Sequence, residues 1–289
     1  MSIQVRILIV LMLVFFLSAG TAKCAEKPRW ELGMGLTFLE MPDYPGSDET
    51  RPYLLPYPYF IYRGDSLKIE KDSISGRFFK SDTISWDFSV FGRVPVNSSK
   101  NAARQGMADL DPTFEIGPSL NIKLFENHQD HYKLSFILPV RAVFSTDFSS
   151  LHREGWGFNP RLIFEKTDLI KNSGLNLGLS AGPMFADSSY NSYYYSVDPV
   201  YATASRPAYS AGGGYSGSTL TVNLNKGFGR LLINTFVSVD FLQGAVNEDS
   251  PLIKKDNSVM YGVAVSWIFL KSAKLITTTD EYNDRQLLY

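Results

Sequence analysis

The stretch ISWDFSVFGRVP, residues 84–95, alternates between two kinds of side chain. One side carries Ile84, Trp86, Phe88, Val90, Gly92 and Val94, and the other carries Ser85, Asp87, Ser89, Phe91 and Arg93. Strict alternation is typical of a β-strand with unlike faces. This stretch alone fits two kinds of protein: a soluble sheet with an apolar core, or a membrane barrel with lipid outside and a wet interior.

The same alternation recurs along the chain and favours the membrane barrel. Its further windows are 30–38, 114–124, 132–144, 156–164, 175–185, 231–241 and 259–269. None of these apolar faces contains a charge, as lipid contact requires, because a Lys or Arg facing lipid at mid-membrane costs roughly 2–4 kcal/mol. Most segments have the length of about 9–11 residues that a tilted membrane-crossing strand needs, whereas soluble strands average about 5–6.

Aromatic residues often begin or end these apolar faces, as in Trp30 and Phe38 or Trp156 and Phe164. Amphipathic rings prefer the two membrane interfaces, where they form girdles around a barrel. We therefore predict an all-β fold, a transmembrane antiparallel β-barrel of about 12 strands in the bacterial outer membrane. A soluble sandwich or lipocalin-like barrel, with the apolar faces turned inward, is the alternative.

The strand positions follow from the alternation and from the turn residues. The predicted strands are 30–40, 52–62, 66–71, 74–80, 84–95, 112–125, 131–145, 154–165, 174–186, 211–226, 230–242 and 258–270. Long connections at 41–51, 96–111, 187–210 and 243–257 are then predicted outside the cell, and the short ones at 63–65, 126–130, 166–173 and 226–229 in the periplasm. Two places are weak: 66–80 could be one bulged strand, and Pro52, Pro56 and Pro58 predict irregular backbone because each lacks a ladder donor.

The ends of the chain predict export. A charged start, the apolar run Ile7–Leu17 and small residues after it are typical of a secretory signal peptide, here 1–24. The barrel then spans 25–270, and the tail 271–289 is predicted in the periplasm. The single cysteine, Cys24, excludes an intrachain disulfide; lipid attachment there is an alternative, but Lys23 occupies a place that normally holds a small residue. A net charge of −1 offers no basic surface for nucleic acid.

Candidates for catalysis are few. His128, His131 and His152 fall in predicted turns or loops, where solvated histidine is the ordinary interpretation. A hydrolase would need His128 or His152 to meet a nucleophile in space, and Ser149 and Ser150 are near His152 only along the chain. The spacing of His and Cys predicts no metal site, and no Gly-rich phosphate loop is present. We predict no enzyme, no catalytic residue and no cofactor.

Two groups of residues are candidates for other roles. Charged residues on the polar faces are predicted to line the lumen: Asp87, Arg93, Glu115, Lys123, Lys133, Arg141, Arg161 and Asp240. They fit either a salt-bridged, partly plugged lumen or a small channel with an eyelet. The tyrosine-rich loop 190–209 fits either an external binding surface or a loop folded over the barrel mouth. Its tyrosines are Tyr190, Tyr193, Tyr194, Tyr195, Tyr201 and Tyr209.

Several motifs resemble the MltA-interacting protein/OmpV family of outer-membrane proteins. The matching residues are Pro42-x-Tyr44-x-Gly46-Ser47-Asp48, the run Leu55-Pro56-Tyr57-Pro58, Gly106-Met107, Asp109-Leu110-Asp111, Glu115, Gly117-Pro118 and Asp249-Ser250-Pro251. Tyr194-Tyr195-Ser196-Val197 is similar to the family's Tyr-Phe-Gly-Val, with two departures. The resemblance covers about residues 30–270. The tail after Phe269 departs from the family, which usually ends on an aromatic closing strand.

This resemblance implies an outer-membrane barrel that acts as a non-enzymatic scaffold. In that role it would join a murein hydrolase (a lytic transglycosylase) to a peptidoglycan synthase. Two alternatives stay open: a small outer-membrane pore for solutes, and a surface adhesin that uses the long external loops. The expected surroundings are outer-membrane lipid, and nothing in the sequence specifies the oligomeric state.

Overall fold

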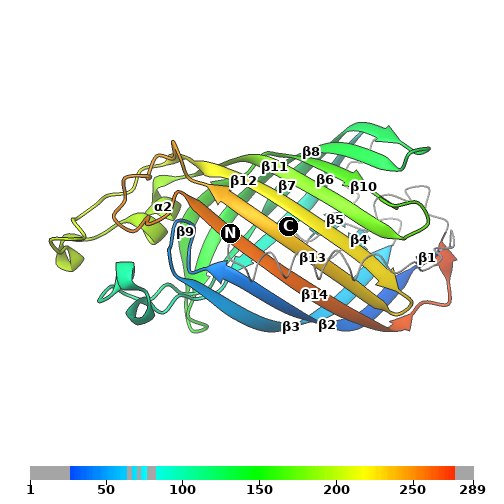
Figure 1. Ribbon diagram of the computed structural model, residues 1–289, viewed down its shortest axis with the longest axis horizontal. Helices are drawn as coiled ribbons and strands as arrows, with labels where there is room; N and C mark the ends of the chain where they lie inside the picture. The colour runs from blue at the N-terminus through cyan, green and yellow to red at the C-terminus, as the bar shows by residue number, and fades with distance from the viewer. Residues whose placement is uncertain (1–26, 64–66, 70–72, 77–82, 277–289) are drawn as a thin grey trace.

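The computed structural model describes residues 27–63, 67–69, 73–76 and 83–276 (Figure 1). The predicted signal peptide and the tail beyond Ile276 lie outside the described residues. The wall is built from β2 (Trp30–Pro42), β3 (Thr50–Arg63), β4 (Leu67–Ile69), β5 (Ser73–Gly76), β6 (Ile84–Arg93), β7 (Thr113–Asn127), β8 (Tyr132–Thr146), β9 (Leu151–Phe158), β10 (Arg161–Lys166), β11 (Leu175–Ala186), β12 (Gly214–Phe228), β13 (Leu231–Phe241) and β14 (Asn257–Lys271).

These strands form one antiparallel sheet that closes into a barrel. Each strand from β2 to β8 pairs with the next, β10 through β14 do the same, and β14 pairs with β2. Both β9 and β10 pair with β8 and with β11, so they are two parts of one strand interrupted at Asn159 and Pro160. Counting them as one reduces the 13 strands of the sheet to twelve in the described part of the chain. The predicted fold class is confirmed.

The barrel is polar inside and apolar outside. On β6 the side chains of Trp86, Phe88 and Val90 are all more than 40% exposed, whereas Asp87 between them is buried. Other strands repeat this: Met34, Trp156 and Trp267 lie exposed on the outer face, and Asn223, Asn234 and Ser266 are buried within. A surface with so much exposed apolar area is stable only against an apolar partner. The outer face is therefore suited to lipid hydrocarbon.

The three prolines of β3 leave the strand regular, so the predicted irregularity is wrong. β3 keeps an unbroken register with β2 from Thr50 to Tyr62. The Arg63 and Asp43 amides both donate across this pair, to Arg29 and Glu49. Odd-numbered amides of β3 therefore face β2, and Pro52, Pro56 and Pro58 lack an N–H only on the opposite side. On that side, within the described residues, β3 pairs with β4 only at Tyr62 and Arg63.

Within 66–80 the described residues 67–69 and 73–76 form two separate strands and not one bulged strand. β4 pairs with β3 and with β5, and β5 pairs with β6 at Ser73 and Ile74. Their described parts have three and four residues, and residues 66, 70 and 71 of the predicted strand 66–71 lie outside the described residues. The rest of the predicted strand 74–80, residues 77–80, lies outside the described residues.

The connections differ at the two ends of the barrel. At one end, the loop end, long connections contain the short helices η1 (Ser98–Lys100), η2 (Ala102–Arg104), α2 (Ser188–Tyr195) and η3 (Pro199–Tyr201) (Figure 1). α2 was predicted as loop. It begins where the Asp187 side chain accepts a hydrogen bond from the Tyr190 amide, an N-cap that polar sequence around it obscures. No helix in the described ranges is long and apolar enough to cross a membrane.

At the other end, the turn end, the two ends of the described chain meet. β1 (Lys27–Pro28) pairs antiparallel with β15 (Leu275–Ile276). Beside this clip, Arg63 Nη2 lies 3.0 Å from Glu31 Oε2, and Lys271 Nζ lies 3.6 Å from Glu31 Oε1. The segment from Lys271 to Ile276, the start of the predicted tail, is therefore held against the residues that lead into β2.

Candidate functional site

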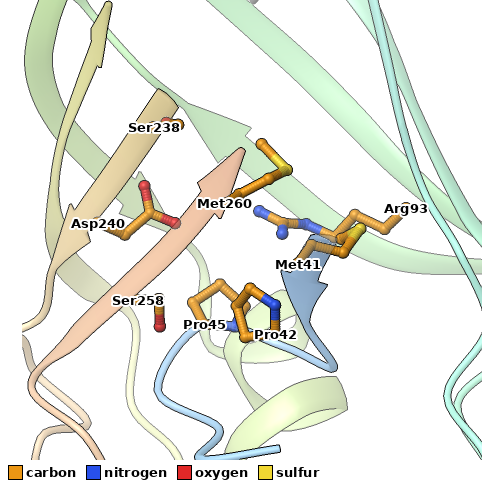
Figure 2. A pocket seen from close by; sticks show the side chains of 8 residues that line it. All are labelled: Met41, Pro42, Pro45, Arg93, Ser238, Asp240, Ser258 and Met260. Carbon is orange, nitrogen blue, oxygen red and sulfur yellow. The ribbon is translucent and has the colours of Figure 1, made fainter. Parts of the chain in front are cut away.

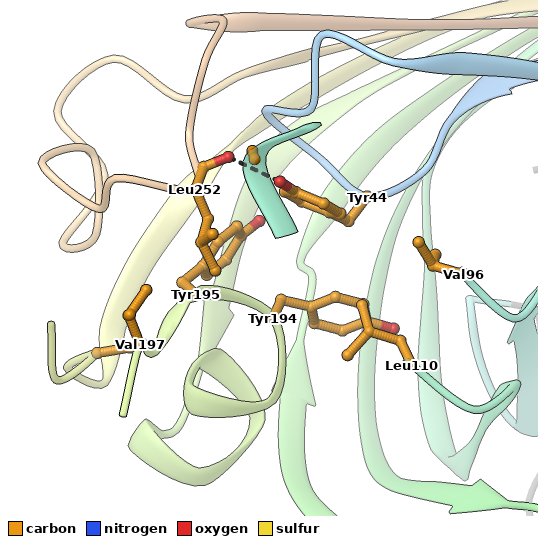
Figure 3. Packing of buried hydrophobic residues seen from close by; sticks show 9 residues of the cluster. Tyr44, Val96, Leu110, Tyr194, Tyr195, Val197 and Leu252 are labelled. Atoms are coloured by element: carbon orange, nitrogen blue, oxygen red, sulfur yellow. Dashed lines mark hydrogen bonds between the residues drawn. The ribbon is translucent and has the colours of Figure 1, made fainter. Parts of the chain in front are cut away.

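Four connections at the loop end pack on one another and form a lid over the barrel. We define the lid as residues 43–49, 96–111, 187–211 and 242–256. Its apolar core consists of Tyr44, Val96, Ala103, Leu110, Tyr194, Tyr195, Val197, Ala211 and Leu252 (Figure 3). Because these residues come from all four connections, the lid is a single packed unit and not a set of independent loops.

Tyrosine hydroxyls join the lid connections to each other. Tyr44 donates to the Leu252 carbonyl at 2.9 Å, the contact drawn in Figure 3, and Tyr195 donates to the Pro45 carbonyl at 3.2 Å. Ser250 Oγ donates back to the Tyr195 carbonyl at 2.7 Å. Burial raises the pKa of both Tyr44 and Tyr195 well above the usual value for tyrosine. These tyrosines therefore act as neutral donors inside the lid.

Arg104 is a charged residue in the middle of the lid, and only 3% of its surface is exposed. Its guanidinium donates to the Tyr194 carbonyl, to Ser98 Oγ and to the Ala108 carbonyl at 3.2–3.3 Å. It also lies 5.8 Å from the centre of the Tyr44 ring. One buried cation thus joins η1 and α2 through its hydrogen bonds and contacts the first connection through the Tyr44 ring.

The lid is fastened to the barrel wall through Tyr190. The Tyr190 hydroxyl donates to Glu115 Oε1 at 2.7 Å, and Arg141 Nε lies 2.9 Å from Glu115 Oε2. Arg141 also donates to Ser89 Oγ at 3.1 Å. Burial, followed by the Glu115 charge, raises the pKa of Tyr190 well above its usual value. The chain of contacts therefore runs from α2 across β7 to β8 and β6.

Glycines on β9 let α2 approach the wall. Gly155 has φ +138°, and a Cβ atom there would stand 2.2 Å from Asp187 Oδ1, the N-cap oxygen of α2. At Gly157 a Cβ would stand 3.5 Å from the Tyr190 ring. Gly155 also lies at a register shift between β8 and β9. A side chain at Gly155 would therefore displace the start of the helix that carries Tyr190.

The tyrosines of 190–209 either belong to the lid core or pack against it. Tyr194 and Tyr195 are buried, and Tyr190 and Tyr193 are half-buried with hydroxyls bonded to Glu115 and to the Asp111 carbonyl. Tyr201 and Tyr209 are half-buried near the tip, where Val200 is 80% exposed. The surface of this loop that is free to meet a partner is therefore the tip 198–205 and not the helix.

The other charged candidates line the interior in local contacts. Asp87 accepts a hydrogen bond from Asn121, Lys133 Nζ lies 2.8 Å from Glu165, and Lys123 Nζ lies 2.6 Å from Glu126 near the turn end. Arg161 donates to Asn159 Oδ1 at 3.4 Å. Acids that the sequence did not single out, Glu165 and Glu126, thus neutralise two of the predicted lysines. Alternation on β10 is the signal that could have found Glu165, whereas Glu126 follows a register shift in β7 after Lys123 and is out of phase with the alternation.

Arg93 and Asp240 border a cavity just under the lid (Figure 2). The cavity is small, about 20 Å³, and is partly open to solvent. Its lining is Met41, Pro42, Pro45, Arg93, Ser238, Asp240, Ser258 and Met260. The guanidinium and the carboxylate face one another from opposite sides of the cavity (Figure 2).

A serine–histidine contact lies on an exposed hairpin. Ser150 Oγ is 3.0 Å from His152 Nε2; His152 is exposed and Ser150 is half-buried. Asp147 Oδ1 accepts hydrogen bonds from the amides and hydroxyls of Ser149 and Ser150. These bonds hold the pKa of the Asp147 carboxyl below its usual range. This pattern is that of a side-chain-capped turn, and among the residues described no cluster of His, Cys, Asp and Glu could hold a metal ion.

Comparison with known proteins finds a family and several outer membrane proteins that this chain is similar to. A family model described as MltA-interacting protein MipA matches residues 32–269. The outer membrane protein Omp26La of Vibrio anguillarum is 24% identical over 216 residues, which cover 73% of this chain and 76% of the relative. OmpV of Vibrio cholerae is 23% identical over the same shares. Among solved structures, an outer membrane channel of Pseudomonas putida F1 covers 86% of this chain and 100% of its own, at 9% identity and a TM-score of 0.44.

The closed sheet, the apolar outer face and the polar interior define a β-barrel protein of the outer membrane. The chain belongs to the MltA-interacting protein family. The resemblance found in the sequence is thereby confirmed.

Proposed function

We propose that this barrel is a non-enzymatic scaffold that holds murein hydrolases and peptidoglycan synthases at the outer membrane. The description of its family, MltA-interacting protein, names a murein hydrolase partner for the family. The observation that carries the proposal is the contact chain Tyr190–Glu115–Arg141, which fastens a packed lid to the wall. A barrel closed in this way is suited to presenting a surface and less suited to conduction.

The turn end offers the surface for such partners. Long loops in outer-membrane barrels are external and short turns periplasmic, so the turn end faces murein. The turn after β10 carries Leu169 and Ile170, which are 40% and 49% exposed. Asp168 holds this turn in shape by accepting hydrogen bonds from the Asn172 and Gly174 amides at 2.7 and 2.8 Å. An ordered turn that exposes two neighbouring apolar side chains is suited to bind a partner protein, since apolar residues that become buried contribute most to interfaces.

The test is crosslinking in intact envelopes, followed by identification of the captured proteins. The wild-type barrel should capture a lytic transglycosylase and a synthase, and the variant Leu169→Asp/Ile170→Asp should lose at least one of them. The matched control is Phe148→Asp/Val200→Asp, which puts the same charges on two residues of the loop end that are 91% and 80% exposed. Capture of no murein enzyme by the wild-type barrel would refute the scaffold.

A surface-binding role is the second candidate, and the exposed tip 198–205 favours it. The bridges Val197–Tyr209 and Thr203–Arg206 order this tip, and Arg206 holds its base on the lid by donating to the Ala103 and Gln105 carbonyls. Loss of cell or matrix binding after removal of the tip, with the barrel still folded, would support an adhesin. Because α2 carries Tyr190, which fastens the lid to Glu115 on the wall, a deletion that includes residues 190–195 would not separate adhesion from lid disruption.

A further inference from the structure

Two groups of aromatic side chains lie on the outer face around β8, one near each end of the barrel. At the turn end the centre of the Tyr132 ring lies 5.6 Å from that of Phe125 and 6.0 Å from that of Phe164. At the loop end the Phe114 and Phe144 rings stack at 5.3 Å. The run of β8 from Tyr132 to Phe144 rises about 3.3 Å per residue at a tilt of about 40°, so it spans roughly 30 Å. This spacing matches an apolar membrane band between two aromatic girdles, and it places Phe144 at the headgroup level of the loop end.

Arg153 is a cation on this lipid-facing surface. It pairs with Phe144 in the register between β8 and β9, and residues paired in this way point to the same side of a sheet. The central carbon of its guanidinium lies 5.0 Å from the centre of the Trp156 ring, a side chain that is 45% exposed on the outer face. Arg153 itself is exposed. The cation therefore lies at the level of the loop-end aromatic side chains and faces away from the lumen.

The charge of Arg153 is not neutralised by the described part of the chain. The guanidinium contacts the Trp156 ring and forms no ion pair with a described residue. The acids near it in the sequence are engaged elsewhere: Asp147 accepts hydrogen bonds that hold the hairpin turn, and Glu154 accepts one from the inward-facing Ser145 hydroxyl. An arginine on the lipid face is costly at mid-membrane and is tolerated near the interface, where anionic headgroups accept its hydrogen bonds. The acceptor for Arg153 is therefore expected to come from the membrane.

We propose that Arg153 and Trp156 form a binding site for a phosphate group of lipid A, the lipid anchor of lipopolysaccharide. Long loops of outer-membrane barrels are external, so the loop end meets the outer leaflet, which lipopolysaccharide forms. The planar guanidinium donates two parallel hydrogen bonds to the phosphate, and stacking on Trp156 fixes its plane. Leu151, which is 58% exposed on the same face, offers an apolar contact beside the charge. The site is independent of the scaffold role.

The test is native mass spectrometry of the purified barrel in a non-ionic detergent, titrated with bisphosphorylated lipid A and with the same lipid after its phosphates are removed. The wild-type barrel should bind the phosphorylated lipid at least about fivefold more tightly, because only this lipid pairs with the guanidinium. Arg153→Gln should remove most of this preference and leave binding of the dephosphorylated lipid unchanged. Arg230→Gln, which removes an exposed arginine at the turn end, is the matched control and should keep the preference.

A second comparison identifies the source of the phosphate. Phosphatidylglycerol carries a phosphodiester, which has less charge and fewer free oxygens than the phosphates of lipid A, and it should bind the wild-type barrel at least about fivefold more weakly. The heat-modifiable gel mobility of a folded barrel checks each variant. Equal binding of lipid A with and without phosphate, an unchanged preference in Arg153→Gln, an equal loss in Arg230→Gln, or equal binding of phosphatidylglycerol would each overturn the proposal.

Discussion

The Tyr190 hydroxyl donates a 2.7 Å hydrogen bond to Glu115 Oε1, although one residue belongs to the lid and the other to the barrel wall. The two are 75 positions apart in the sequence. Glu115 is in turn paired with Arg141, so the position of the lid is coupled to a buried charge pair inside the barrel. Removing any member of this chain should therefore change the lid and the interior together.

Tyr190→Phe should loosen the lid without unfolding the barrel. The variant keeps the ring but loses a hydrogen bond to a charged group, which contributes roughly 1.5–3 kcal/mol. Amide hydrogen exchange in 187–196 should become at least about tenfold faster. Tyr209→Phe is the matched control, because the Tyr209 hydroxyl makes only a 3.4 Å contact with Asn247. Equal exchange rates in both variants would contradict the claim that the Tyr190–Glu115 hydrogen bond holds the lid on the wall.

Gly155→Ala should disturb α2 for two reasons, because the alanine strains the backbone and also collides with the start of the helix. The alanine must adopt φ +138° and place its Cβ against the Asp187 carboxylate, at a cost on the order of 1–3 kcal/mol for the backbone alone. Gly106→Ala is the control, since Gly106 has φ +83° but no atom within 4 Å of a Cβ. Limited proteolysis of 187–210 should be faster in the first variant. If the two variants are cleaved alike, close packing of α2 on β9 is not what holds the lid.

Arg141→Gln should be strongly destabilising because it leaves the Glu115 carboxylate buried beside only one remaining donor. Breaking a buried pair by removing one partner typically costs about 3–5 kcal/mol. The double variant Arg141→Gln/Glu115→Gln should recover part of this loss, since no charge then stays uncompensated. Urea unfolding of the barrel in lipid vesicles measures all three. Additive losses in the double variant would show that the two side chains act independently.

Alkaline pH should release the lid. Burial raises the pKa of Tyr44, Tyr190, Tyr194 and Tyr195 in the folded state, whereas in the unfolded chain tyrosine titrates near about 10. A raised folded pKa means that the stabilisation is complete below about pH 10 and is lost as the pH rises through the folded values. Tyrosinate absorbance, followed together with proteolysis of the lid, checks this. Titration of these tyrosines near pH 10 with an unchanged cleavage rate would argue against their burial.

The strands could be predicted from the sequence because lipid and water impose alternation on every residue of the wall. At β2, β6 and β13 the observed bounds fall within two residues of the predicted ones. The β3 prolines misled the prediction because their effect depends on which neighbour each amide faces, and that follows from register, a property of two strands. The interruption of β9 and β10 at Asn159 and Pro160 likewise had no counterpart in the alternation.

The lid was only half predictable. A tyrosine-rich loop suggested either a binding surface or a cover, and the residue types alone do not choose between them. The choice depends on long-range contacts such as Arg104 with Tyr194, 90 positions apart. Nothing in the local pattern marks Arg104, because a loop arginine is ordinarily solvated. The charged residues of the wall were easier to find, since alternation assigns each of them to the inner face.

The measurement that tests the account most directly is ion conductance across planar lipid bilayers. The proposed scaffold role requires that the fastened lid closes the barrel and that the protein works through its surfaces. The wild-type barrel should therefore give no steady open-channel current, and Tyr190→Phe or Arg104→Ala should give frequent openings. Steady currents through the wild-type barrel that change in size on substitution of Arg141 or Asp87, and do not respond to the lid variants, would contradict it.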